Sequence, residues 1–273
     1  MSSSPVIELD SATRVTEEGG TFRIVLSDAW DIWGPNGGYL AAIALRAASM
    51  RAEIRRPASL YCHFLSSPKF DEVTLHVDVL KKGRRSESLS VQMRQNGKPV
   101  LQALVRTAAD APGYEHQQLV APTVPPPDNL KTYDELYAGD GGPRYKFWQN
   151  VETRPSDQTM PTRGQRAVAR DWARFRPQAC FDDPFVDAAR SLILLDTYGW
   201  PAAWRTYQDE RYIAPNLDTS AWFHHFSPHS EWLLIDHACP IADRGLLGVQ
   251  GHVWDNEGKL LATGSAQLCC LPL

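Results

Sequence analysis

GPNGGYLAAIALRAASM, residues 34–50, is the stretch that decides the fold. Pro35 and Asn36 are typical of a helix start, and apolar residues then fall on nearly every side of the expected helix. A helix without a polar face must be covered all round, because water would otherwise contact its apolar side chains. A curved antiparallel sheet is the expected cover, since the segments that follow alternate like strands.

Five segments of the first half have the pattern of strands. Lys82-Gly83-Arg84 and Asn96-Gly97 are turn signals, and Asn-Gly between alternating segments strongly indicates a β-hairpin. The last three strands are therefore expected to form a meander. The expected strands are TFRIVLS (21–27), SLYCHFL (59–65), EVTLHVDVLKK (72–82), SESLSVQMR (86–94) and PVLQALVRTA (99–108).

The second half repeats this pattern, with SLYCHFLSSP matched by TSAWFHHFSP and QNGKPVLQALV by NEGKLLATGSA. The expected elements are strands 144–152 and 165–176, a helix over 182–199, and strands 220–226, 231–239, 246–255 and 259–270. A duplication of this length predicts an α+β fold of two units that join their sheet edges into one continuous sheet. The units are placed at residues 1–115 and 144–273. The linker between them, 116–143, is rich in proline and glycine.

The composition is that of a globular protein: 273 residues, 43% apolar, 22% charged, with a net charge of −4. This balance gives no sign of nucleic-acid binding, which normally shows as a basic excess. No apolar run approaches the roughly 20 residues that span a bilayer. The N-terminus lacks the pattern of a signal peptide, so a cytoplasmic location is expected. The five cysteines are expected to be reduced, buried thiols, because none has metal-binding spacing.

SLILLDTYGW, residues 191–200, carries one carboxylate in an apolar run. If the helix begins near Pro184, Asp196 lies on the face that packs against the sheet. Burying an ionised carboxylate without partners costs several kcal/mol, on the order of the penalty for any buried ion. Two interpretations remain open: a structural aspartate held by hydrogen bonds, or a residue with a chemical role.

Three stretches together point to a family: WGPNGGYLAAIALRAA, LDTSAWFHHF and NEGKLLATGSAQL. In their order and spacing the chain resembles the double hotdog acyl-CoA thioesterases, the type II bacterial group, over nearly its whole length. The resemblance implies two repeats of a long central helix wrapped by a curved antiparallel sheet. It also implies hydrolysis of acyl-CoA to free acid and CoA by an activated water, without a cofactor or a metal.

The resemblance assigns catalytic residues. Asp196 matches an aspartate that helps orient the attacking water, together with a glutamine that falls on Gln267 and a hydroxyl position that is Asn216 here. One extra residue precedes Gln267, which we interpret as a β-bulge at Gly264–Ser265. If that strand is in simple register instead, Ala266 takes the place of the glutamine and the site is broken.

Two further groups are candidates for substrate binding. Gly37 and Gly38 can offer backbone N–H groups to a developing oxyanion, or can simply allow a tight helix entry. Lys81, Arg84 and Arg85 surround a hairpin turn, where they can contact CoA phosphates or form a solvated edge. His224 and His225 point to opposite faces of a strand, which argues against a metal site.

Two other functions compete with hydrolysis. One is a non-catalytic acyl-CoA binding protein. The other is an enoyl-thioester hydratase on the same fold, which needs an Asp-x-Asn-x-x-x-His type arrangement that the sequence lacks. The sequence does not determine the length or type of the acyl chain. It allows a homodimer or a higher homo-oligomer, as the hotdog resemblance suggests.

Overall fold

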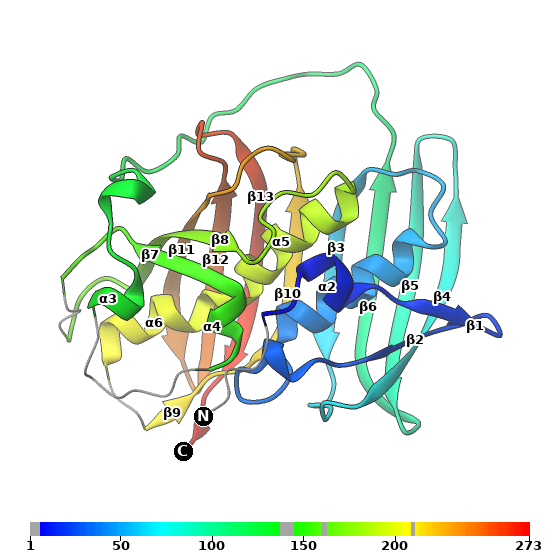
Figure 1. Ribbon diagram of the computed structural model, residues 1–273, viewed down its shortest axis with the longest axis horizontal. Coiled ribbons are helices and arrows are strands. Elements are labelled where there is room, and N and C mark those ends of the chain that lie inside the picture. Colours follow the sequence, from blue (N-terminus) through cyan, green and yellow to red (C-terminus); the bar gives the residue numbers. More distant parts are fainter. Residues whose placement is uncertain (1–5, 137–144, 160–162, 209–210) are drawn as a thin grey trace.

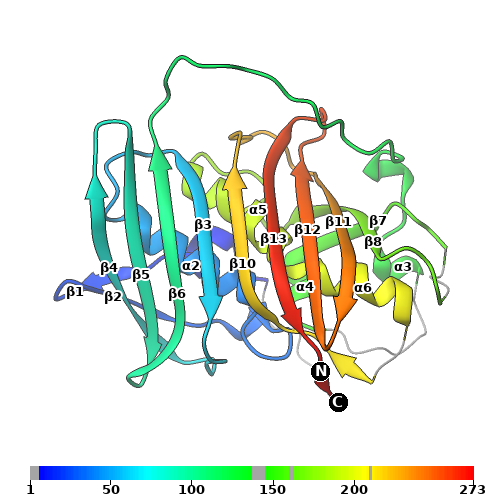
Figure 2. The same ribbon diagram turned by 180° about the vertical axis from the view of Figure 1, so that it is seen from behind.

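The computed structural model describes residues 6–136, 145–159, 163–208 and 211–273. Within these residues, one 12-stranded sheet wraps around two long helices that lie side by side (Figures 1 and 2). The strand order is β1-β2-β4-β5-β6-β3-β10-β13-β12-β11-β8-β7, and all of its pairings are antiparallel. The α+β double hotdog fold is therefore confirmed.

The N-terminal unit surrounds the first long helix, α2 (Gly37–Ser49). All residues of α2 except Gly37 and Arg46 are buried, as its apolar composition predicts. Asn36 caps the helix by accepting a hydrogen bond from the Tyr39 backbone. The other elements of this unit are α1 (Leu9–Thr13), β1 (Thr16–Glu18), β2 (Thr21–Val25), a 3-10 turn (Asp28–Trp30), β3 (Pro57–Phe64), β4 (Glu72–Lys82), β5 (Ser86–Gln95) and β6 (Lys98–Ala108).

The C-terminal unit surrounds the second long helix, α5 (Pro184–Thr197), which is buried from Phe185 to its end. Asp183 caps it and Pro184 opens it, a combination typical of helix N-termini. The other elements are α4 (Phe147–Asn150), β7 (Val151–Pro155), β8 (Val168–Phe175), α6 (Gly199–Tyr207), β10 (Asn216–Phe223), β11 (Leu233–Asp243), β12 (Leu246–Trp254) and β13 (Leu260–Cys269), with the short pair β9 (Tyr212–Ile213) and β14 (Leu271–Pro272).

The two units join where β3 pairs with β10, and this pairing removes the inner edge of each sheet. Above the joint, α2 and α5 pack in opposite directions. Gly38, at the start of α2, faces Ile193 and Asp196 near the end of α5. At the other end, Arg46 of α2 forms an ion pair with Asp183, the cap of α5. The duplication inferred from the sequence therefore gives two places where the start of one helix meets the end of the other.

Two expectations for the C-terminal unit were wrong. The strand expected at 144–152 begins only at Val151, because Phe147–Asn150 form a helical turn that lets Asn150 bond to the Ala29 carbonyl. The helix expected to end at 199 is followed by α6, whose third residue is Pro201. Proline in a first helical turn sacrifices no hydrogen bond, so it did not end the helical region.

A long connection leads from β6 to the C-terminal unit, and residues 109–126 have no regular structure in it (Figure 2). A 3-10 turn (Pro127–Asn129) and α3 (Tyr133–Leu136) follow. The glycine-rich part of the expected linker, 139–142, lies outside the described residues. The limits at 115 and 143 stay a prediction.

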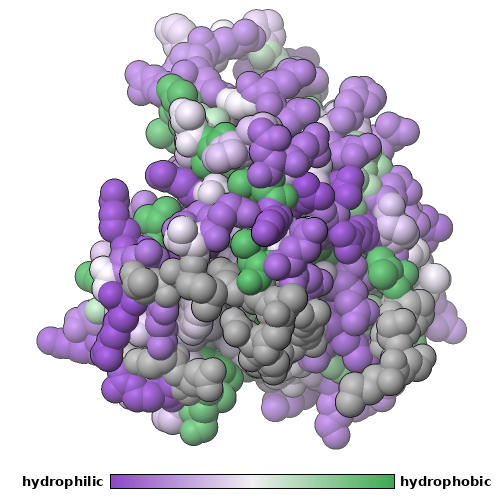
Figure 3. Space-filling view, turned by 60° about the vertical axis from the view of Figure 1, so that its left-hand side comes forward, coloured by the Kyte–Doolittle hydropathy of each residue, from purple (hydrophilic) through white to green (hydrophobic). Residues whose placement is uncertain are grey.

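The surface view in Figure 3 is mostly hydrophilic on the face it shows, with small, separate apolar areas. Among the described helices, none combines the length and the apolar character needed to cross a bilayer.

Candidate active site

The Asp196 carboxyl group lies where α5, the start of α2 and the start of β10 meet. Its residue is 5% exposed. The Nδ2 atom of Asn216 donates to Oδ1 of Asp196 at 2.7 Å and to the main-chain oxygen of Asp196 at 2.8 Å. The structure therefore brings together Asp196 and Asn216, which are 20 residues apart in the chain.

Burial raises the pKa of Asp196 from 3.8 to about 7, because the ionised form loses its hydration. The hydrogen bond from Asn216 and the backbone N–H of Gly38 act in the opposite direction, since both favour the negative charge. A carboxyl group with this pKa exchanges its proton readily near neutral pH. That property suits a general base.

Gly37 and Gly38 allow α2 to approach α5 closely at this point. A Cβ atom on Gly37 would lie 2.9 Å from Oδ2 of Asp196. A Cβ atom on Gly38 would lie 2.8 Å from the Cα atom of Ile193 and 3.0 Å from the Cβ atom of Asp196. The close helix contact explains why both positions need glycine. It also places the N-terminus of α2 beside the carboxylate, where the Gly38 N–H bonds to Asp196.

A β-bulge does lie near the site, but in β10 rather than β13. The pairing of β10 with β13 skips Leu217, because Asn216 pairs with Leu268 and Asp218 with Gln267. The expected bulge at Gly264–Ser265 was wrong: β13 pairs residue by residue with β12 from Ala262 to Cys269. The observed bulge turns the Asn216 side chain toward the interior, where it reaches Asp196.

This register separates Gln267 from Asp196. Gln267 is exposed, whereas its neighbours Ala266 and Leu268 are buried, so the Gln267 side chain lies on the outer face of the sheet. Its backbone N–H donates to Oδ1 of Asp218. Ala266 takes the inward place that the resemblance gives to a glutamine, so the expected arrangement of Asp196, Asn216 and Gln267 is broken at Gln267.

Thr219 was missed by the sequence reasoning. It is 2% exposed and pairs with Cys62 of β3 on one side and with Ala266 of β13 on the other. Counting back in steps of two from the buried Ala221 would have identified Thr219 as an inward hydroxyl. Burial raises the pKa of the Cys62 thiol well above its usual range, and the negative charges of Asp196 and Asp218 raise it further.

The hairpin turn that carries Lys81, Arg84 and Arg85 lies at the opposite end of β3 from this site. Phe64, the last residue of β3, reaches Gly37, and Pro57 is the first residue. Thr107 of β6 pairs with both Pro57 and Glu87, so the β4–β5 turn lies at the Pro57 end. The structure therefore does not bring Lys81, Arg84 and Arg85 to Asp196.

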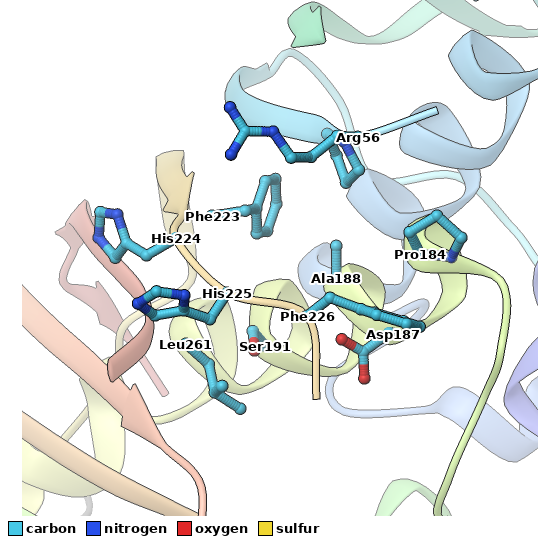
Figure 4. Close-up of a pocket in the computed structure, with 11 residues that line it drawn as sticks. Arg56, Pro184, Asp187, Ala188, Ser191, Phe223, His224, His225, Phe226 and Leu261 are labelled. Carbon is cyan, nitrogen blue, oxygen red and sulfur yellow. The ribbon is translucent and has the colours of Figure 1, made fainter. Parts of the chain in front are cut away.

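The duplication creates a second, related place at the start of α5, shown in Figure 4. A cavity of about 50 Å³ lies there between α5, the end of β10 and the start of β3. The carboxylate that lines this cavity belongs to Asp187. It forms an ion pair with Arg190 and accepts a hydrogen bond from the backbone N–H of Ser227. Asp196 is the thirteenth residue of α5, and the thirteenth residue of α2 is Ser49, whose hydroxyl donates to the Arg46 carbonyl. The second place therefore lacks a counterpart of Asp196.

The chain belongs to the acyl-CoA thioesterase family. The family model for the acyl-CoA thioesterase N-terminal domain matches residues 26–108, and the model for the acyl-CoA thioesterase C-terminal domain matches residues 121–271. The activity of this family is hydrolysis of acyl-CoA thioesters, and neither a binding protein nor a hydratase is favoured over it.

Individual relatives agree with this assignment. Human acyl-coenzyme A thioesterase 8 is 27% identical over 252 residues, which cover 83% of this chain and 77% of the relative. The mouse acyl-coenzyme A thioesterase 8 is 26% identical over 249 residues, with the same coverage of both chains.

Solved structures share the fold. A hot dog fold protein from Alicyclobacillus acidocaldarius has a TM-score of 0.84 at 21% identity, over 97% of this chain and 98% of that one. The acyl-CoA thioesterase II TesB2 from Mycobacterium marinum has a TM-score of 0.80 at 22% identity, over 97% and 99%.

Proposed function

We propose that the protein hydrolyses acyl-CoA at one site, with Asp196 as the general base. The observation that carries this proposal is a buried carboxyl group, with a pKa of about 7, held between Asn216 and the N-terminus of α2. A water molecule attacks the thioester carbonyl carbon and passes a proton to Asp196. The tetrahedral intermediate then loses CoA as the C–S bond breaks, and Asp196 returns the proton to the thiolate.

Asn216 is a positioning residue in this proposal. Its Nδ2 donors are directed at the side chain and the main chain of Asp196, which fixes the orientation of the carboxylate. An asparagine can thus replace a hydroxyl residue at the start of β10.

Gly37 supplies the backbone N–H for the oxyanion. As the first residue of α2 it has no N–H partner within the helix, and the helix dipole favours negative charge at this end. The Gly38 N–H is directed instead to the Asp196 carboxylate. One helix N-terminus would then stabilise both the base and the transition state.

The test is an acyl-CoA panel of several chain lengths, with release of free CoA measured by a thiol reagent. We expect hydrolysis of at least one member and a loss of about 10²-fold or more in kcat for Asp196→Asn, which is the usual contribution of a general base. Asp218→Asn is the matched control, because Asp218 lies one register position from the site and its carboxylate bonds to the Gln267 backbone on the outer face.

Other outcomes would identify the competing functions. Tight binding of acyl-CoA with no thiol release at any chain length would support a binding protein. Loss of an enoyl-CoA double bond without thiol release would support a hydratase. Hydrolysis that survives in Asp196→Asn would contradict the assignment of the base while leaving the activity in place.

A cytoplasmic location and a homo-oligomeric state are part of the same proposal. The location rests on the free cysteines. The oligomeric state rests on the hotdog resemblance. Fractionation of the source cells and light scattering of the purified protein test these two points.

A further inference from the structure

A second polar side chain is buried on the inner face of β10, three residues after Asn216, and takes no part in the hydrogen bonds described so far. Thr219 is 2% exposed, and its Oγ1 atom has no hydrogen-bond partner among the described residues. Buried hydroxyl groups are normally hydrogen-bonded, because burial removes the water that they would otherwise bind. An unpartnered buried hydroxyl on the strand whose first residue contacts Asp196 is therefore a candidate for contact with a substrate or a bound water.

The bulge at Leu217 places Thr219 on the same face as Asn216. Without a bulge, residues three apart in a strand point to opposite faces. Here Asn216 reaches Asp196, and Thr219 is buried on the interior face together with Ala221. Because of the bulge, both Asn216 and Thr219, near the start of β10, point inward.

The strand neighbours of Thr219 offer its hydroxyl no strong hydrogen-bonding partner. Its partner in β13 is Ala266, which has no polar side-chain atom, and its partner in β3 is Cys62, a weak hydrogen-bonding group. The charge of Asp196 acts on the Cys62 thiol, which places the carboxylate within electrostatic reach of this row of three residues.

We propose that the Thr219 hydroxyl holds the attacking water, as a catalytic residue in addition to Asp196. This inference rests on the proposed hydrolytic function. The water gives one O–H to Asp196, which removes the proton, and the second O–H to Oγ1 of Thr219. Its lone pair is then directed at the thioester carbonyl carbon, and no bond to Thr219 is formed or broken. The hydroxyl supplies the polar contact that the outward register of Gln267 cannot supply.

The test compares three variants. Thr219→Val keeps the shape of the side chain and removes the hydroxyl, Thr219→Ser keeps the hydroxyl, and Ser220→Ala removes a hydroxyl that bonds to Ser265 instead. We expect Thr219→Val to lower kcat about tenfold or more with KM changed less than about twofold, as for an interaction made mainly in the transition state. Thr219→Ser should stay within about threefold of wild type, and Ser220→Ala within about twofold.

Two further measurements separate this role from a structural one. Thermal unfolding should show little loss of stability in Thr219→Val, because the hydroxyl forms no hydrogen bond to another described residue and the water that it holds can leave with it. A high-resolution crystal structure of the wild type should show an ordered water within hydrogen-bond distance of Thr219 Oγ1 and the Asp196 carboxylate, and Thr219→Val should lack it.

The outcomes distinguish this inference from the proposed function. If Thr219→Val keeps kcat while Asp196→Asn loses it, the role of Thr219 is wrong and the function stands. If Thr219→Ser loses as much activity as Thr219→Val, the hydroxyl is not the operative group. If the wild type hydrolyses no acyl-CoA, the proposed function fails, and absence of the bridging water from the crystal structure would overturn the role of Thr219 as well.

Discussion

The Nδ2 atom of Asn216 lies 2.7 Å from Oδ1 of Asp196, and this contact ties the first residue of β10 to the end of α5. The same nitrogen lies 2.8 Å from the main-chain oxygen of Asp196. The pair depends on the bulge at Leu217, since a regular strand would turn Asn216 away. A local irregularity in one strand therefore sets the orientation of the carboxylate.

The rate of hydrolysis should rise with pH and level off above a pH of about 7, because Asp196 must be ionised to accept a proton and its pKa is about 7. The measurement is kcat/KM from about pH 5 to pH 9, with an acyl-CoA that saturates the enzyme. A profile that stays flat over this range would exclude Asp196 as the titrating base.

Asn216→Leu should move this rise to higher pH and lower kcat, because the hydrogen bond from Asn216 keeps the pKa of Asp196 below the value that burial alone would give. We expect a fall in kcat of about tenfold, since the carboxylate also loses its orientation. Asn216→Thr is the control, because a hydroxyl can still donate to Asp196. Unchanged profiles in both variants would show that Asn216 does not act on the carboxyl group.

Asp196→Asn should stabilise the fold above pH 7. The folded-state pKa of Asp196 is raised from 3.8 to about 7, so the folded state binds a proton that the unfolded state has lost between these values. Ionised Asp196 therefore lowers the free energy of unfolding progressively from about pH 4 to pH 7, by on the order of 4 kcal/mol at the upper end.

Denaturant unfolding of both proteins checks this prediction. The advantage of the variant should grow from pH 5 to about pH 7 and then stay constant. Asp218→Asn serves again as the control for a carboxylate outside the site. An advantage that is independent of pH would mean that Asp196 has an ordinary pKa in the folded protein.

Gly38→Ala should destabilise the protein and abolish activity. The added Cβ atom would lie 2.8 Å from the Ile193 backbone, so α2 and α5 must move apart. Gly37→Ala should lose activity with a smaller loss of stability, because its Cβ atom meets the Asp196 carboxylate and the tip of Phe64 rather than backbone. Melting temperatures and kcat of both variants give the comparison.

Gly113→Ala is the matched control for these glycines, since nothing lies within 4 Å of the position of its Cβ atom. It should behave like the wild type in both measurements. Full activity in Gly37→Ala would argue against a close approach of the α2 N-terminus to the reacting atoms.

Gln267→Ala should leave kcat and KM within about twofold of wild type, because the side chain lies on the outer face of the sheet. Steady-state kinetics with the best substrate of the panel provide the test. A loss as large as that of Asp196→Asn would mean that β13 adopts the other register in solution, with Gln267 facing Asp196.

The sequence by itself determined the fold and singled out Asp196 as a buried carboxylate. The apolar residues of 34–50, the hairpin signal at Asn96-Gly97 and the repeat in the second half are local patterns, and helix and strand periodicities follow directly from them. Asp196 stood out because helical spacing from Pro184 alone places it on the buried face. Burying a carboxylate costs free energy, so a carboxylate at that position needs partners or a chemical role.

Only the tertiary structure decided which other side chains meet Asp196. A shift of one residue between paired strands moves every side chain to the opposite face, and the sequence did not show whether the irregularity lay in β10 or β13. The pairing of β10 with β13 directs Asn216 and Thr219 inward and Gln267 outward. The contact of Gly37 and Gly38 with α5 likewise depends on the packing of two helices that are about 150 residues apart in the chain, which no local pattern encodes.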